Sequence, residues 1–506
     1  MVRSSYRHFP THIPRLLFHE LHLVVIIECI YGAAHLQSVF DQGNDVTAVI
    51  DIIAEHHGIS SKRVAEYLRM NEELVGFGRG GGESLVLYLR SKSGNLFVRK
   101  IVSESFATSA WDPNGKNEMS APFRRALMQA EFIASLPESA ARFFPKIYDV
   151  RSQARAATSD ERLRFRRDFA EDTIYDISYL PGTDLSAFIE QVRPPARVTA
   201  AIYRELARLV RDNIHTHRRR SRAENTLEQC YFRKIEQRLE LAKKSIPTVL
   251  NDDFVDAPVI LINRQPYLGI RGVLSELRDQ AQKHSMLEAP GYCLTMGDMN
   301  TQNIKIGNEQ VILAARASGR DDFSYHDLGI GLVDPRAIGP ISQGATTVDD
   351  YLYDSKFWHN SLAHYDVWYN GHFDLNLSKS GGLPEISIRL ASHHPFRESY
   401  QDVGAFLAEV MEKGFGEGQN SLLDADPHWA VRFVFLMGTH MCAMLPFHLQ
   451  KTTNGEVVDD WRRQTRAIAL YCEGIVWLNR AAAMLRGHIP ATPEMTAMPW
   501  LREYDA

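Results

Sequence analysis

A loop in the second half of the chain carries side chains suited to catalysis. The run LTMGDMNTQNI begins at Leu294 and places Asp298 five residues before Asn303, between apolar flanks. A carboxylate at this spacing can accept the proton of a substrate hydroxyl while the asparagine holds a magnesium ion. Loops rich in Asp and Asn are often only turns, so this motif alone leaves both interpretations open.

A second aspartate stands at the end of a predicted strand. The run GIGLVDPR, residues 329–336, delivers Asp334 to the carboxyl end of an apolar segment. An oxygen ligand there can hold Mg²⁺ together with phosphate oxygens. Asp322 in the run DDFS competes for this role, but no apolar strand precedes it. We therefore predict Asn303 and Asp334 as the metal ligands.

A glycine-rich segment precedes two alternating apolar stretches in the N-terminal part. The run GFGRGGGES contains Gly78, Gly80, Gly81 and Gly82 and stands before a predicted strand. P-loop and dinucleotide motifs instead place their glycines between a strand and a helix. A glycine-rich turn between strands can cover nucleotide phosphates, because backbone N–H groups then approach the oxygens closely. A flexible hairpin loop explains the same residues equally well.

Lys100 lies some twenty residues further on, near the end of the strand-like LFVRKIV. Alternation puts Lys100 on the inner, apolar face of this strand and Arg99 on the other face. An inward lysine needs an anion, which nucleotide phosphates would supply, and we expect Glu131 in the following helix to orient it. The alternatives are a lysine that extends to solvent from the strand end and a solvated helix glutamate.

These side chains must be positioned by a small strand-rich part and a larger helical part. Residues 73–103 predict a β-hairpin with a glycine-rich entry, and the chain after Pro181 is mainly helical in pattern. Charged residues and a proline interrupt the apolar stretch 429–450, which therefore predicts a buried helix and not a membrane span. The run HTHRRRSR from His215 could meet a phosphate or carboxylate, but it more simply predicts a solvated helix end.

Composition narrows the function classes. With 506 residues the chain is too long for one core, and its net charge of -5 does not favour nucleic acid. The five cysteines are scattered and form no CxxC pair, which indicates neither a disulfide framework nor a zinc site. We expect a cytoplasmic protein that associates with neither nucleic acid nor membrane.

In order and type, these segments resemble the aminoglycoside and choline kinase branch of the protein-kinase-like fold. The matching segments are the glycine loop, the strand lysine, the helix glutamate, a hinge reading YDISYLPGTDL, the GDMNTQN loop and the VDPR strand. The resemblance implies an α+β, bilobal fold with a small antiparallel-sheet N-lobe and a larger helical C-lobe. We assign 1–70 to an N-terminal extension of unknown role, 71–180 to the N-lobe and 181–506 to the C-lobe.

The resemblance also implies the reaction. The co-substrate would be ATP or GTP with Mg²⁺, and the acceptor a hydroxyl of a sugar, aminocyclitol or similar metabolite. Tyr179 and Leu180 in the hinge would contact the nucleotide, and Asp298 would orient the acceptor. The Asp-Pro-Arg ending resembles a bacterial subgroup in which Asp354 would support the catalytic loop, although Asp354 also suits a helix N-cap.

Two departures from the family pattern leave an alternative open. Met296 replaces the histidine usual before Gly-Asp, and the long gap between Asn303 and Asp334 predicts an inserted turn over Gly319–Asp327. A non-catalytic nucleotide-binding pseudokinase is therefore the second hypothesis, although mere binding does not require Asp298. A protein kinase is disfavoured because no Ala-Pro-Glu-like segment follows Asp334. The sequence leaves the acceptor, the choice between ATP and GTP and the oligomeric state open.

Overall fold

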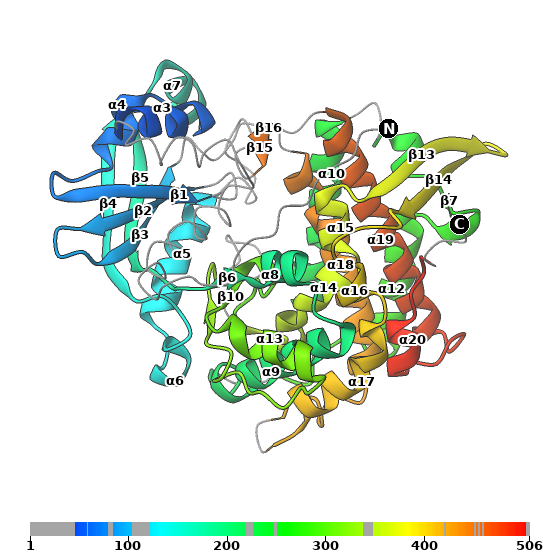
Figure 1. Cartoon of the computed structure of the whole chain (residues 1–506). Coiled ribbons are helices and arrows are strands. Elements are labelled where there is room, and N and C mark those ends of the chain that lie inside the picture. The colour runs from blue at the N-terminus through cyan, green and yellow to red at the C-terminus, as the bar shows by residue number, and fades with distance from the viewer. Residues whose placement is uncertain are drawn as a thin grey trace, which may run out of the picture.

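The fold is seen in a computed structural model of the chain. It describes residues 46–501 except 58, 79–83, 104–121, 219–225, 247–249, 337–347, 419–420, 450–451, 454–455 and 458–459. Gly80, Gly81 and Gly82 lie outside the described residues. A sheet-rich lobe and a helical lobe stand on opposite sides of Figure 1, and the predicted α+β class is confirmed.

A five-stranded antiparallel sheet forms the N-lobe, in the order β1-β2-β3-β5-β4. The strands are β1 (Glu72–Gly78), β2 (Leu85–Ser91), β3 (Leu96–Ser103), β4 (Ile147–Ala156) and β5 (Phe169–Ser178). Helices α3 (Val46–His57) and α4 (Ser61–Glu66) share a hydrophobic core with β1, β2, β3 and β5. The described part of the N-terminal extension is thus packed against the sheet. The lobe also contains α5 (Pro122–Ala134), α6 (Glu138–Ala141) and α7 (Ser159–Phe165).

The first half of the helical lobe surrounds short strands. A three-stranded sheet in the order β11-β10-β6 follows the chain's passage out of the N-lobe. The elements are β6 (Thr183–Asp184), α8 (Leu185–Val192), α9 (Ala196–Asn213), η3 (Glu228–Phe232), α10 (Arg233–Ser245), α11 (Asp252–Val255), β7 (Val259–Ile262), β8 (Gln265–Leu268), α12 (Ile270–Lys283), β9 (Cys293–Leu294), η4 (Thr301–Asn303), β10 (Ile304–Ile306), α13 (Glu309–Ser318) and β11 (Ile330–Leu332).

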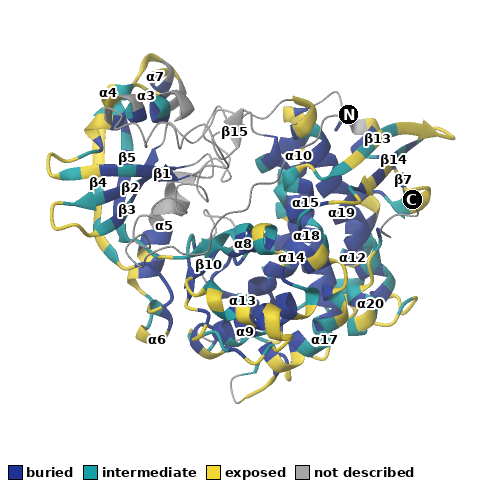
Figure 2. Ribbon diagram, in the orientation of Figure 1, coloured by how far each residue is buried: buried dark blue, intermediate teal, exposed yellow. Residues whose placement is uncertain are grey.

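The second half of this lobe adds a hairpin and the two longest helices. It contains β12 (Val348–Asp349), η6 (Tyr351–Ser355), α14 (Phe357–Ser361), α15 (Tyr365–Asn370), β13 (Phe373–Ser380), β14 (Leu383–Leu390), α16 (Arg397–Tyr400), η7 (Val403–Phe406), α17 (Leu407–Val410), η8 (Met411–Gly416), α18 (Trp429–His448), β15 (Thr452–Thr453), β16 (Glu456–Val457), α19 (Asp460–Leu485) and α20 (Pro493–Ala497). Dark blue in Figure 2 shows that buried residues concentrate where these helices meet.

Helices α18 and α19 form the centre of this core. By length and composition, both helices could cross a membrane. However, 89% of the most apolar 18-residue stretch of α18 and 83% of that of α19 are buried inside the protein. Glycines allow the two helices to approach closely: a Cβ added at Gly474 would lie 2.3 Å from the Cys442 sulfur. The prediction of a buried helix at 429–450 is confirmed by α18.

The predicted alternation along β3 is confirmed by a buried ion-pair network around Arg99. Its side chain is fully buried, and its Nε and Nη2 atoms each donate to Asp176 at 2.7 Å. The same guanidinium donates to Glu72 at 2.6 and 2.8 Å and to the Tyr67 carbonyl at 2.6 Å. Arg99 therefore joins β1, β3, β5 and the end of the N-terminal helices, while Lys100 faces the opposite side.

Replacing Arg99 with Met should destabilise the N-lobe strongly. The change leaves two buried carboxylates without their cation, a loss that typically costs about 3–5 kcal/mol. Arg90→Met on neighbouring β2 is the matched control, because Arg90 pairs with the exposed Glu73 and such surface pairs contribute about 1 kcal/mol or less. Denaturant unfolding of both variants tests this, and equal losses would contradict the structural role given to Arg99.

Candidate active site

Lys100 and Asp334 meet between the two lobes. The Lys100 ammonium lies 2.5 Å from Asp334 Oδ1 and donates to Gln129 Oε1 at 3.0 Å. Burial disfavours the ammonium, but the Asp334 carboxylate raises the pKa of Lys100 above its ordinary value, so the lysine stays charged. Asp334 has left-handed backbone geometry (φ 55°), which non-glycine residues rarely adopt outside turns and functional sites. The sequence predicted both residues, and the structure joins them directly.

Gln129 occupies the place predicted for Glu131. Its side-chain oxygen accepts from Lys100 and from the Tyr175 hydroxyl, both at 3.0 Å, whereas Glu131 is exposed. Two residues along a helix are separated by about 200° around its axis, so both cannot face the sheet. The structure therefore contradicts the predicted pairing of Lys100 with Glu131. The apolar pattern of this helix could have fixed its buried face, but the expectation of a carboxylate favoured the wrong residue.

Asp298 is held by two cations. Lys356 Nζ lies 3.1 Å from Asp298 Oδ1, and Arg336 Nε lies 3.1 Å from Oδ2. Burial opposes ionisation of this carboxyl, but Lys356 and Arg336 lower its pKa to about 2. Lys356 also donates to the Gly297 carbonyl at 3.1 Å. We predicted no role for Lys356, because nothing in its local sequence shows that it returns to the loop around Asp298.

Short strands bring the predicted metal ligands side by side. β10 pairs with β11 in antiparallel register, with Ile304 opposite Leu332. At the end of this ladder the Val333 amide donates to the Asn303 carbonyl at 3.0 Å, which puts Asn303 next to the residue that precedes Asp334. The Asn303 amide nitrogen donates to the Asp298 carbonyl at 2.9 Å. The segment between β10 and β11 contains the ten-residue helix α13 as well as the predicted turn.

Asp354 holds the backbone of the loop that contains Asp298, residues 294–303, which we call the catalytic loop. Its carboxylate accepts from the Met296 and Gly297 amides, both at 2.9 Å, and lies 3.0 Å from His215 Nε2. The capping role belongs to Asp350, whose side chain accepts from the Leu352 amide. His215 is buried, so the prediction of a solvated helix end is wrong at this residue. A histidine distant in sequence thus reaches the carboxylate that holds the Met296 and Gly297 amides.

A second chain of buried hydrogen bonds holds the other end of this loop. The Thr301 amide donates to Asn360 Oδ1 at 3.2 Å, and Asn360 Nδ2 donates to Asp366 Oδ1 at 2.8 Å. The Tyr400 hydroxyl donates to Asp366 Oδ2 at 2.6 Å. Burial raises the pKa of Asp366 to about 6, which its hydrogen bonds oppose. Helices α14, α15 and α16 therefore fix the loop through polar contacts.

The predicted nucleotide contacts lie along the passage between lobes. Tyr179 packs edge-on against Tyr88, with ring centres 6.1 Å apart. The Leu180 side chain packs over Gly331 of β11, where an added Cβ would lie 3.1 Å from Leu180 Cδ1. Gly78 ends β1 beside Val86, whose Cγ1 would be 3.0 Å from an added Cβ. An added side-chain carbon at Gly331 or Gly78 would therefore require the Leu180 or Val86 side chain to shift by a few tenths of an ångström.

No family model and no curated protein matches this sequence. Among solved structures, the chain is similar to a Plasmodium vivax ethanolamine kinase, with 9% identity, a TM-score of 0.37 and coverage of 94% of this chain and 99% of that one. It is also similar to the amicoumacin kinase hAmiN in complex with AMP-PNP, Ca²⁺ and Ami, with 12% identity, a TM-score of 0.36 and coverage of 84% and 91%. Similarity at such low TM-scores carries no information about function. The chemistry of the site is therefore inferred only from the side chains of this chain.

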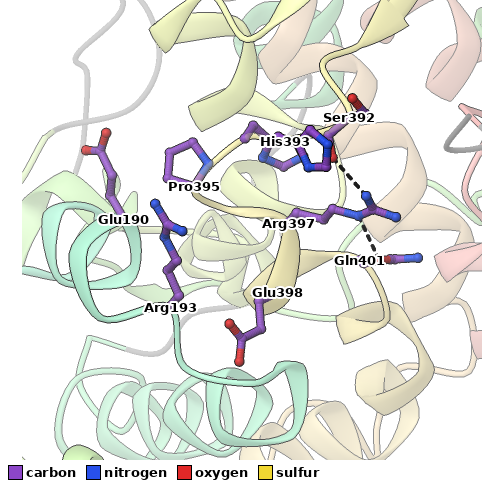
Figure 3. Close-up of a pocket in the computed structure, with 9 residues that line it drawn as sticks. Glu190, Arg193, Ser392, His393, Pro395, Arg397, Glu398 and Gln401 are labelled. Atoms are coloured by element: carbon purple, nitrogen blue, oxygen red, sulfur yellow. Dashed lines mark hydrogen bonds between the residues drawn. The ribbon is translucent and has the colours of Figure 1, made fainter. Parts of the chain in front are cut away.

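A surface hollow of about 620 Å³ lies elsewhere, near the end of α8 (Figure 3). Its lining comes from α8, the following Arg193 and the segment 392–401. It contains both acidic and basic groups, and Arg397 donates to the Ser392 carbonyl at 2.8 Å across its wall. None of the predicted site residues lines this hollow, so we do not assign the reaction to it.

Replacing Asp354 with Ala should loosen the catalytic loop. Two buried amides lose their acceptor, and unsatisfied buried donors cost about 1–3 kcal/mol each. The variant should lower the free energy of unfolding and accelerate hydrogen exchange at the Met296 and Gly297 amides. Asp322→Ala, at an exposed aspartate, is the control and should change neither quantity. Unchanged exchange at these amides would show that Asp354 does not hold the loop.

Proposed function

We propose that the chain is a magnesium-dependent small-molecule kinase, which transfers the γ-phosphate of ATP or GTP to a hydroxyl of a metabolite such as a sugar or cyclitol. The observation that carries this proposal is the direct pairing of Lys100 with Asp334, beside Asn303 and the catalytic-loop carboxylate Asp298. A lysine from a β-strand and an aspartate after a β-strand form the charged centre of phosphoryl-transfer sites in this fold class.

The donor set fits Mg²⁺ bound with a nucleotide. Asp334 offers a carboxylate that is 44% exposed, and Asn303 uses its amide nitrogen on the Asp298 carbonyl, which leaves its oxygen for a metal. In the part of the chain that the structure describes, no group of three or more His, Cys, Asp or Glu side chains could hold a metal alone. Mg²⁺ is usually bound by one or two carboxylates plus phosphate oxygens and water, so this sparse set suits it. The bound metal would neutralise phosphate charge.

The protein's own groups would position the reactants. Lys100 would exchange its Asp334 partner for phosphate oxygens, because both are anions that satisfy a buried ammonium. Asp298 would accept a hydrogen bond from the acceptor hydroxyl and take its proton as the hydroxyl oxygen bonds to the γ-phosphorus and the bond from that phosphorus to the β,γ-bridging oxygen breaks, releasing the nucleoside diphosphate. A carboxylate with a pKa of about 2 is a weak base, so its main contribution would be orientation of the hydroxyl.

The rival pseudokinase hypothesis is disfavoured by the same geometry. A protein that only binds nucleotide needs Lys100 and Asp334 but has no use for an ionised carboxylate held by Lys356 and Arg336. Nucleotide binding without acceptor-dependent turnover on any acceptor would favour this rival.

The test is Mg²⁺-dependent nucleotide consumption by purified protein with pooled sugars, cyclitols, nucleosides and amino alcohols. Asp298→Asn should lower turnover by about 100-fold or more, the usual contribution of a positioned acid or base, while nucleotide affinity stays nearly unchanged. Asp334→Ala should lose Mg²⁺-dependent nucleotide binding as well. A fully active Asp298→Asn enzyme would contradict the role of Asp298.

The pH dependence of turnover should reveal the cations around Asp298. With a pKa of about 2, Asp298 stays ionised throughout the usual assay range, so its protonation should not limit the wild-type rate above pH 4. Lys356→Met removes a cation 3.1 Å away, which raises the pKa of Asp298 and moves the acid limb of the rate profile to higher pH. Lys413→Met removes a half-exposed lysine on α17–η8 that pairs with Glu409, and should leave the limb in place. An unshifted limb in Lys356→Met would contradict this assignment.

A further inference from the structure

Basic side chains from several elements gather around Lys356 and the Asp298 carboxylate that it contacts. Lys356 and Arg336 contact its carboxylate directly. Lys234 and Arg238, one turn apart on α10, approach from the helical lobe, and the positive charges of Arg336 and Arg238 both act on Lys356. Clustering of like charges is unfavourable without an anion to balance it. We name Lys234, Arg238 and Lys356 the basic triad.

Resting on the proposed kinase function, we propose that the basic triad binds an anionic group, a carboxylate or a phosphate, on the hydroxylated acceptor. An acceptor must present its hydroxyl to Asp298, so cations beside Asp298 face the rest of that molecule. The amino sugars and aminocyclitols that the family resemblance implies carry positive charge and would be repelled here.

The ring of Tyr353 organises the triad. The Lys356 ammonium lies 4.6 Å from the ring centre and the Lys234 ammonium 5.3 Å from it. Lys234 also donates to the Tyr353 hydroxyl at 2.7 Å. The Lys356 ammonium is attracted to the π-electrons of the ring, while Lys234 is held at its hydroxyl edge, so one side chain positions both ammonium groups. Arg238 is anchored next to them by the Ala443 carbonyl at 2.7 Å and the Phe447 ring.

A buried histidine beside the triad supplies an independent observation. His440 is 3% exposed, and its Nδ1 lies 3.0 Å from His359 Nε2, while its own Nε2 has no hydrogen-bond partner. The charges acting on His440 come from Lys356, Lys234 and Arg238 together with His359. A buried polar atom without a partner usually has one supplied by a ligand or a water. When Nδ1 accepts from the His359 Nε2–H, the neutral His440 carries its proton on Nε2, where an anionic or hydroxyl oxygen of a ligand can accept it.

Carboxylates near the triad do not remove this preference. Asp298 already interacts with Lys356 and Arg336. Asp349, which acts on Lys234, is fully buried and accepts from the Tyr231 hydroxyl at 2.8 Å. Burial raises the pKa of Asp349 to about 6, so at neutral pH it is mostly ionised and, with Asp298, offsets two of the four positive charges of the triad and Arg336. Among the residues that the structure describes, the groups around Lys356 therefore carry more positive than negative charge.

The experiment is calorimetric titration of the full chain in the presence of Mg²⁺ and AMP-PNP. The probes are two matched sets: glucose, glucosamine, glucuronate and glucose 6-phosphate, and glycerol, ethanolamine, glycerate and glycerol 3-phosphate. We expect the anionic members to bind at least about tenfold more tightly than the neutral and cationic members. One charge-assisted hydrogen bond contributes enough binding free energy for a difference of this size. Comparing carboxylate with phosphate probes identifies which anion the triad takes. Added NaCl should weaken only the anionic probes.

Variants on one helix make the test specific. Lys234→Gln with Arg238→Gln should abolish the preference for anions and leave AMP-PNP affinity unchanged. Arg233→Gln, at a side chain that is 53% exposed and pairs with Glu228, should retain it. A double variant that loses AMP-PNP affinity instead would assign the cations to the nucleotide and overturn the proposal.

Two further outcomes separate this inference from the proposed function. Tighter binding of glucosamine or ethanolamine, or no binding of any anionic probe at 10 mM, would overturn the anionic acceptor while AMP-PNP binding leaves the kinase intact. Failure of AMP-PNP to bind with Mg²⁺ would overturn the proposed function and this inference with it.

Discussion

The contact between Lys100 and Asp334 is the constraint on which the site depends, because it joins residues 234 positions apart across the two lobes. A buried ammonium is costly unless an anion stands next to it. Lys100 is fixed by the register of β3 between β2 and β5, and Asp334 by the ladder of β10 and β11. Two sheets that share no strand must therefore be placed to within a hydrogen-bond length of each other. Nucleotide phosphates would enter where two fixed charges already meet.

The catalytic loop is rigid for a different reason. It has little regular structure of its own, and its backbone is held by side chains from the helical lobe. At one end, Asp354 accepts hydrogen bonds from two backbone amides. At the other end, Asn360, itself hydrogen-bonded to Asp366, accepts one from a third amide. Buried polar networks of this kind stabilise one arrangement only when each member is satisfied. Asp298 can then be aimed by Lys356 and Arg336 without movement of the backbone.

Much of this could be predicted from local sequence. Lys100 and Arg99 follow from the two-residue period of one strand, and Asp334 from an apolar run that ends in a carboxylate, since both signals lie within a few residues. Glu131 was misplaced although the apolar pattern of its helix indicates the buried face, because the two-residue step from Gln129 turns a side chain by about 200° around the helix axis. His215 and Lys356 act on the loop from far along the chain, so their roles depend on tertiary packing that no local pattern contains. The glycines at 80–82 lie outside the described residues, and their predicted role stays a prediction.

The central claim is that Lys100, Asn303 and Asp334 together form a nucleotide and magnesium site. The most direct measurement is a crystal structure of the full chain with Mg²⁺ and AMP-PNP. We predict a metal ligated by Asp334 and Asn303, and phosphate oxygens on Lys100 in place of the Asp334 carboxylate. A nucleotide bound elsewhere, such as the hollow at the end of α8, with Lys100 still paired to Asp334, would contradict it.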